Sequence, residues 1–230
     1  MRPGIADADG SGRCRLDAMA RWLQDIAYAD LVDAGFEGRG AWVVRRTRIR
    51  VDAFPRFGEA ISSRTFCSGI GRFSAERRTS IRGEHAAVET VSLWVCLDPE
   101  RRRPMRFPPE FLSIYEESAG GRDANVRLRH PDPPETADRS TWTFRASEMD
   151  PAGHINNSHY WTPVEEELAA GQEPERIDAC TVPSAPAIQS DDPSRSSATF
   201  PGMAGSRNST SASIRSGSWP AASSSSTGVQ

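Results

Sequence analysis

Residues 13–35 read RCRLDAMARWLQDIAYADLVDAG, and this stretch decides the fold class that the sequence predicts. Its apolar side chains recur at helical spacing: Leu16, Met19, Ala20, Leu23, Ile26 and Ala27. This periodicity predicts an amphipathic helix that places one face in a core, and Gly35 supplies a stop signal.

The segment that follows changes from helical spacing to alternation. Short runs rich in β-branched and aromatic residues predict four strands, over residues 42–52, 60–68, 73–82 and 88–97. Short turns separate them, so the strands form an antiparallel meander. Such a sheet buries one face, and the preceding helix is the available cover. The predicted class is therefore α+β.

A second copy of this unit is predicted to begin after a proline-rich connector. The connector spans 101–139, where Pro104, Pro108-Pro109 and Pro131–Pro134 are expected to interrupt any regular element. Residues 141–146 then predict a strand, 147–157 a polar loop and 158–170 a helix. The repeated order of elements indicates an internal duplication.

The periodic pattern ends near residue 181. Residues 181–230 contain 15 serines and only two aromatic residues. Two interpretations stay open: a natural disordered tail, or out-of-frame translation of a GC-rich gene. The second is favoured because the tail begins where the second unit should form its sheet, and because all 28 basic residues are Arg.

The composition argues against several classes of function. The chain has 230 residues and a net charge of −3, which argues against nucleic acid as the main partner. No apolar run approaches the roughly 20 residues that span a bilayer, and no apolar secretory segment is visible near Met1. Four widely spaced cysteines favour reduced thiols in a cytoplasmic protein, and they give no support to a zinc site.

The polar loop carries the candidate chemistry: Asp150, His154 and the pair Asn156-Asn157 precede a predicted helix. A carboxylate beside an imidazole can make the imidazole a general base or an orienting group. The free N–H groups of a helix N-terminus suit an oxyanion. Simpler roles compete, because either asparagine could cap the helix. His159 has no acidic third ligand at a suitable spacing, so no metal is expected.

Several motifs in the correct order make the chain resemble the acyl-ACP thioesterases of bacterial type. The first half contributes the helix at 13–35, AWVVRRTRIRVDAFPRFGE at 41–59 and ETVSLWVCLDPERRRPMRFPPEF at 89–111. The second half contributes SEMDPAGHINNSHYWTPVEEEL at 147–168. The resemblance covers about residues 5–178.

The resemblance implies a double hotdog fold, in which each unit is a long helix wrapped by an antiparallel sheet. It divides the chain into an N-terminal hotdog with the acyl-chain pocket (1–118), a linker (119–139), the start of a catalytic C-terminal hotdog (140–180) and the aberrant tail (181–230). The implied activity is hydrolysis of a fatty acyl–acyl carrier protein thioester in fatty acid biosynthesis. No cofactor is implied, and the chain is expected as a monomer (a pseudo-dimer) or a homodimer.

Carried over by position, the family's catalytic Asp and His correspond to Asp150 and His154, and Asn156 to the first Asn of its pair. The plant-type members have Asn at the position of Ala152, and they use a glutamate on the strand after the second helix. No match for that glutamate is found, while Glu165 or Glu166 matches a different acid of the family's helix. Loss of this strand leaves two alternatives to an active acyl-ACP thioesterase: an acyl-CoA hotdog thioesterase, or a non-catalytic acyl-binding or degenerate member.

Overall fold

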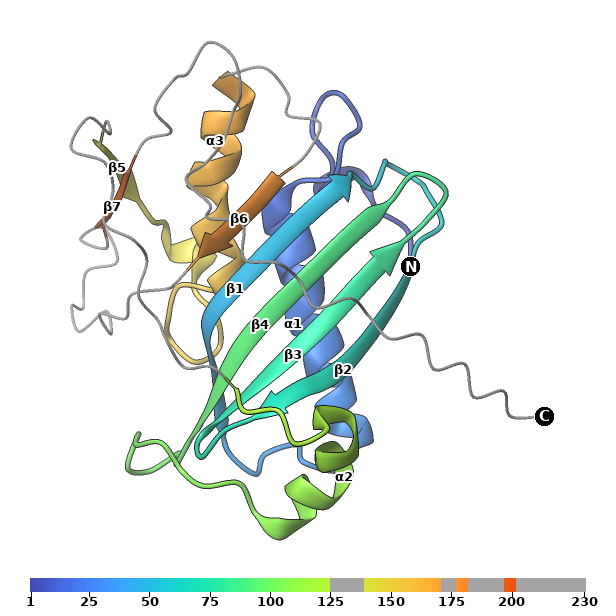
Figure 1. Ribbon diagram of the computed structural model, residues 1–230. Helices are drawn as coiled ribbons and strands as arrows, with labels where there is room; N and C mark the ends of the chain where they lie inside the picture. Colours follow the sequence, from blue (N-terminus) through green and yellow to red (C-terminus); the bar gives the residue numbers. More distant parts are fainter. Residues whose placement is uncertain (125–138, 171–176, 182–196, 202–230) are drawn as a thin grey trace.

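The structure, a computed structural model, describes residues 1–124, 139–170, 177–181 and 197–201 (Figure 1). A long helix, α1 (Leu16–Asp33), lies across one face of a strongly curved sheet. After a short 3-10 turn (Ile5–Asp7), the chain enters α1 and then runs through four strands in succession. The prediction of a helix followed by an antiparallel meander is confirmed.

The sheet has the order β2-β3-β4-β1-β6, and its ladders are antiparallel. The four strands of the first half lie within a few residues of their predicted bounds: β1 (Ala41–Ala53), β2 (Ser62–Ile70), β3 (Ser74–Arg82) and β4 (Ala87–Leu97). An irregularity in β1 between Val44 and Arg46 shifts its register against β4. Bulges of this kind bend a strand and strengthen its twist, which helps a sheet to wrap around a helix.

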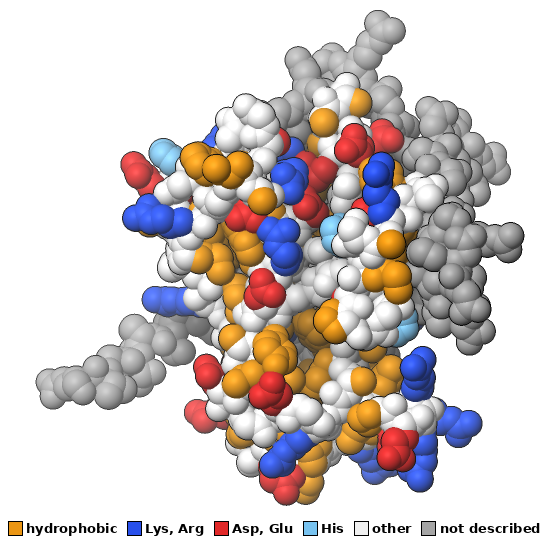
Figure 2. Space-filling model, turned by 180° about the vertical axis from the view of Figure 1, so that it is seen from behind, with side chains coloured by type: hydrophobic (Ala, Val, Ile, Leu, Met, Phe, Trp, Pro, Cys, Tyr) orange, Lys and Arg blue, Asp and Glu red, His pale blue; other side chains and the backbone are white. Residues whose placement is uncertain are grey.

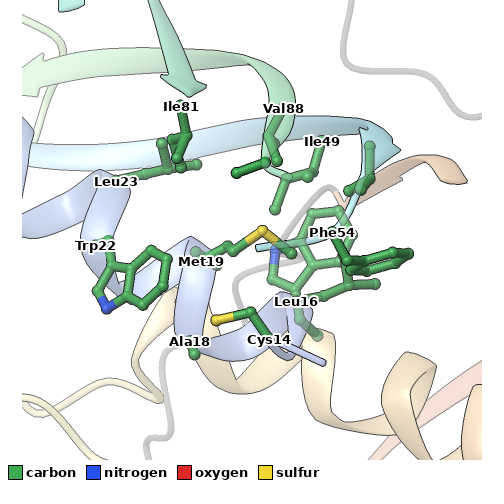
Figure 3. Close-up of a cluster of buried hydrophobic side chains, with 14 of the residues drawn as sticks. Cys14, Leu16, Ala18, Met19, Trp22, Leu23, Ile49, Phe54, Ile81 and Val88 are labelled. Atoms are coloured by element: carbon green, nitrogen blue, oxygen red, sulfur yellow. The ribbon is translucent and has the colours of Figure 1, made fainter. Parts of the chain in front are cut away.

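The core lies between α1 and the sheet (Figure 3). Leu16, Met19 and Leu23 of α1 are buried, as the helical periodicity predicts. They pack in one cluster with Ile49, Val51, Ile81 and Val88 of the sheet. Each such side chain contributes about 1.5–3 kcal/mol when it is removed from water, so this contact is the main force that holds the sheet on the helix.

The second half packs against α1 as well. It consists of β5 (Arg139–Thr143), two 3-10 segments (Ala146–Glu148 and Asn157–Trp161), α3 (Thr162–Ala170) and β6 (Ile177–Thr181). Trp161 is 1% exposed and belongs to the same hydrophobic cluster as Leu16 and Met19, together with Leu168. The two halves therefore share one core. The strand β6 pairs with β1, so part of the second half extends the sheet of the first.

The prediction that the connector 101–139 contains no regular element is wrong. Residues Pro109–Ala119 form the helix α2, with Pro at its first position and Gly120 at its end in the left-handed conformation (φ 57°). Proline is well suited to the first turn of a helix, where its missing N–H costs nothing. Residues 125–138, most of the expected linker, lie outside the described residues.

The second unit is incomplete over the described residues. The strand β6 follows α3, at the point where the second unit was expected to form its sheet, but it pairs with β1 of the first unit. Within the expected tail, Ser197–Pro201 forms β7, which pairs with β5. Residues 182–196 and 202–230 lie outside the described residues. Among the helices described, none combines the length and the apolar character required to cross a bilayer.

Candidate functional site

The loop that carries Asp150 and His154 is a tight hairpin. Met149 and Ile155 form an antiparallel bridge, and the N–H of Asp150 donates to the carbonyl of His154 at 2.8 Å. The turn closes with Gly153 N–H donating to the Asp150 carbonyl at 2.9 Å, and Gly153 has a φ of 75°. Asp, Pro and Gly at the first, second and fourth positions are the residues that a type I turn favours.

The Asp150 carboxylate holds this turn from within. Its Oδ1 atom accepts the backbone N–H of Ala152 at 2.9 Å and of His154 at 3.2 Å. The structure thus brings Asp150 to His154 through the main chain. The His154 imidazole is exposed, and it has no hydrogen bond or ion pair with the residues that the structure describes.

Asn156 caps the segment after the loop. Its Oδ1 atom accepts the N–H of Ser158 at 2.9 Å and the Ser158 hydroxyl at 2.8 Å. The same oxygen accepts a third hydrogen bond, of 2.8 Å, from Nε2 of Gln24 on α1. The capping role that the sequence left open is therefore present. The predicted helix over 158–170 is confirmed except that its first turn is 3-10.

His159 does not belong to a group of potential metal ligands among the described residues. Its Nδ1 lies 3.9 Å from Oε1 of Glu148. No group of three or more His, Cys, Asp or Glu residues arranged for a metal occurs within the described part of the chain.

Glu165 is a buried acid whose contacts the sequence does not reveal. Its carboxylate accepts from Nη2 of Arg13 at 2.6 Å and from the N–H of Leu16, in the first turn of α1, at 2.5 Å. Burial alone would lower the pKa of Arg13, but the hydrogen bonds and charges of Glu165 and Asp9 raise it overall. Glu165 therefore joins α3 to the start of α1 and is already engaged in structure.

A cavity of about 340 Å³ opens between α1 and the sheet in the first half. Its lining is mainly apolar and aromatic: Ala27, Leu31, Trp42, Ala75, Trp94 and Phe111. A volume and lining of this kind are typical of small-molecule sites. Cys67 also lines the cavity, but burial raises the pKa of its thiol, so it is a poor nucleophile there.

An aromatic cluster closes the end of the cavity that faces α2. The ring of Phe111 stacks on Trp42 with a centroid distance of 5.5 Å and on Phe107 at 4.4 Å. Tyr115, one helical turn after Phe111, contacts it at 4.6 Å. This cluster is not among the features predicted above, although Pro at the start of α2 and the spacing of Phe111 and Tyr115 are signals for a helix with one aromatic face.

Gln24 links the cavity to the polar loop. It lines the cavity on α1, and its amide donates to Asn156, two residues after His154. The face of the molecule that carries α1 shows hydrophobic side chains near its centre with charged residues around them (Figure 2). The large hydrophobic residues exposed on α1 are Tyr28 and Val32.

Comparisons with known proteins show which family and which relatives this chain resembles. Residues 4–115 match the acyl-ACP thioesterase N-terminal domain family. An uncharacterized protein of Mycobacterium tuberculosis is 25% identical over 169 residues, which is 73% of this chain and 68% of that protein. The palmitoyl-acyl carrier protein thioesterase of Arabidopsis thaliana chloroplasts is 27% identical over 63% of this chain and 40% of its own length.

Among solved structures, an acyl-ACP thioesterase from Bacteroides thetaiotaomicron superposes with a TM-score of 0.58 at 20% identity. The match covers 72% of this chain and 70% of that one. This likeness confirms the fold class: a hotdog unit followed by a second, incomplete one.

Proposed function

We propose, from the premise that this chain belongs to the acyl-ACP thioesterase family through residues 4–115, that it hydrolyses the thioester of a fatty acyl–acyl carrier protein. The observation that carries the proposal is the hydrogen bond of 2.8 Å between Gln24 and Asn156. It joins the lining of an apolar cavity, sized for a small molecule, to the loop that holds Asp150 and His154. The unit at 1–118 would hold the acyl chain, and the unit at 140–180 would supply the catalytic groups.

The proposed reaction uses water as the nucleophile. The His154 imidazole takes a proton from water as its oxygen adds to the thioester carbonyl carbon. The tetrahedral intermediate then expels the thiolate, which receives that proton from the imidazolium. The products are a free fatty acid and the carrier protein thiol. Asp150 sets the position of His154 through the turn, and Asn156 fixes the loop against α1.

The exposure of His154 suits this role. The phosphopantetheine arm of a carrier protein delivers the thioester from solvent, so the reacting group must be reachable from outside. The imidazole is exposed, and the Asp150 carboxylate is bonded to the backbone instead, so the imidazole is free to meet a substrate that arrives from solvent.

One specific observation supports a second candidate function, acyl binding without hydrolysis. Two acids of the second half, Asp150 and Glu165, are both engaged: Asp150 by two backbone N–H groups and Glu165 by Arg13 and Leu16. Neither is a spare general base. A chain that retains the cavity but not the chemistry would bind fatty acids and leave thioesters intact.

The deciding experiment measures thiol release from lauroyl-ACP and from lauroyl-CoA. His154→Ala should lower the rate by about 10²–10⁴-fold if the imidazole is the general base. His85→Ala, which removes an exposed histidine of the first half, is the matched control and should leave the rate unchanged. Equal rates for wild type and His154→Ala would remove His154 from the mechanism. Binding of fatty acid without thiol release would establish the second candidate, and faster turnover of the CoA thioester would replace the carrier protein as the substrate partner.

A further inference from the structure

The wall of the cavity is mainly apolar, with Gln24, Tyr28, Glu76 and Tyr115 among its polar residues, and its one positively charged residue among those described lies on β3. Arg77 lines the cavity there, and its side chain is only 13% exposed. Its Nη2 donates to Oδ2 of Asp30 on α1 at 2.5 Å, and its Nη1 donates to the hydroxyl of Thr65 on β2 at 3.2 Å. A guanidinium inside an acyl-chain cavity is costly to bury, and it offers nothing to a plain hydrocarbon chain.

Arg77 belongs to a hydrogen-bonded cluster that is centred on Asp30. Tyr115 of α2 donates its hydroxyl to Oδ2 of Asp30 at 2.8 Å. Burial, and then the hydrogen bond to Asp30, raise the pKa of Tyr115, so its hydroxyl stays protonated. Three elements, α1, α2 and β3, therefore converge on one carboxylate.

Some hydrogen-bond donors along this wall have no acceptor among the described residues. A guanidinium has five N–H groups. Arg77 donates one to Asp30 and one to Thr65 and also contacts the Tyr115 hydroxyl, so the described residues leave some of its N–H groups without an acceptor. Trp94 on the neighbouring strand β4 also lines the cavity, and its buried indole N–H has no hydrogen-bond partner among the described residues. Buried donors in native proteins are rarely left without an acceptor.

The charge of the cluster selects the kind of acceptor. Asp30 already balances the positive charge of Arg77, so a second carboxylate would be in excess there. A neutral oxygen can accept an N–H of Arg77 without disturbing that balance. A hydroxyl or a keto group meets this requirement.

The position along α1 indicates where on the acyl chain the oxygen lies. Gln24, which contacts the candidate catalytic loop, precedes Asp30 by six residues, a rise of about 9 Å along the helix. The oxygen therefore lies several carbons away from the thioester. Beyond it, Leu31, Trp42 and Phe111 line the remaining part of the cavity and would hold the apolar end of the chain.

We infer that the acyl group held in this cavity is a fatty acyl chain with a hydroxyl or keto oxygen at mid-chain, recognised by Arg77. This inference rests on the proposed function in taking the cavity as the acyl-chain site. It goes beyond that function by naming the substrate class, an oxygenated acyl chain.

The test is direct binding, which does not depend on hydrolysis. Isothermal titration of the full chain compares lauric acid with a series of monohydroxylauric acids in which the hydroxyl moves along the chain. One mid-chain isomer should bind about tenfold or more tightly than lauric acid. Its hydroxyl oxygen accepts a hydrogen bond from the charged Arg77, and lauric acid has no oxygen at that position. Arg77→Met should remove this preference while lauric acid binds as well as before or better. Arg64→Met, on the exposed part of β2, is the matched control and should keep the preference.

The outcomes separate the two proposals. If lauric acid and every hydroxylated isomer bind equally to the wild type, the inference is overturned while the cavity remains an acyl site. If no fatty acid binds, the inference falls together with the assignment of the cavity. If Arg77→Met does not fold, the binding series with the wild type decides the question. Tyr115→Phe then tests the cluster, because it keeps the ring and removes only a hydroxyl. This variant should show a weaker preference for the hydroxylated acid.

Discussion

Arg13 and Glu165, which are 152 residues apart in the chain, form an ion pair of 2.6 Å between side chains that are only 4% and 8% exposed. The other oxygen of Glu165 accepts the N–H of Leu16 and so caps α1 from outside its own segment. A carboxylate is favourable at this end of a helix because the free N–H groups there carry positive charge. One side chain of the second half thus fixes the start of the main helix of the first.

Glu165→Gln should therefore destabilise the protein strongly. Breaking a buried ion pair by removal of one partner typically costs about 3–5 kcal/mol, because the remaining charge stays buried. Asp9, whose Oδ2 lies 2.8 Å from Nε of Arg13, would offset part of this. Urea unfolding measures the loss, and Glu166→Gln at the next, exposed position is the control. An unfolding free energy within 1 kcal/mol of wild type would contradict the structural role of Glu165.

Asn156→Ala should lower both stability and activity. The loss of the cap alone costs about 1 kcal/mol, and the amide of Gln24 loses its acceptor as well. Asn156→Asp keeps an oxygen that can accept all three hydrogen bonds, so it should retain most of the stability. The melting temperatures of both variants check this. A similar loss in both would show that capping is not the main contribution of Asn156.

Asp150→Asn distinguishes a positioning role from a charge effect. Both N–H groups donate to a single oxygen, Oδ1, and the amide oxygen of Asn can accept them in the same way. If Asp150 only holds the turn, the variant should keep kcat within about tenfold of wild type, whereas Asp150→Ala should lose the larger factor expected for the general base. A pH–rate profile completes the test. A displaced limb in Asp150→Asn would show that the negative charge acts on His154.

The ionised carboxylate of Glu59 is expected to contribute to the free energy of unfolding, and this contribution depends on pH. Partial burial would raise its pKa, but the backbone N–H groups of Arg56, His85 and Ala86 lower it below the ordinary value of 4.5. When a carboxyl has a lower pKa in the folded state, its ionised form stabilises the protein at pH values above the ordinary pKa. This contribution is lost as the pH falls through the lower pKa of the folded state. Glu59→Gln should therefore be less stable than wild type at neutral pH, with a difference that shrinks in acid. Urea midpoints over a pH series measure it, and a difference that stays constant with pH would contradict the prediction.

Much of the first half could be predicted because its signals are local. The periodicity of Leu16, Met19 and Leu23 predicts the buried face of α1, and alternation gives the four strands. The helix α2 was missed because Pro108-Pro109 was interpreted only as an interruption. The same prolines stand where a helix can begin, and Gly120 stands where it ends.

The parts that could not be predicted depend on contacts between distant segments. The sequence offers no sign that Glu165 reaches Arg13, that Gln24 meets Asn156 or that β6 pairs with β1. For the candidate site, the sequence correctly places Asp150 and His154 in one loop, but it does not reveal that the carboxylate accepts from the main chain. Which residues of α1 face the cavity depends on the curvature of the sheet, which no local pattern encodes.

The strand β6 has a consequence for how the protein avoids joining copies of itself. Its residues Ile177–Thr181 cover the hydrogen-bonding groups of Val51–Thr47 on β1. Without them, that stretch would be an open template onto which a β1 strand of another molecule could dock. With them, the edge of the sheet over this stretch is a strand of only five residues, and short edge strands are poor templates for pairing. A variant that weakens the pairing of β6 with β1 is therefore expected to form concentration-dependent oligomers before it loses its fold.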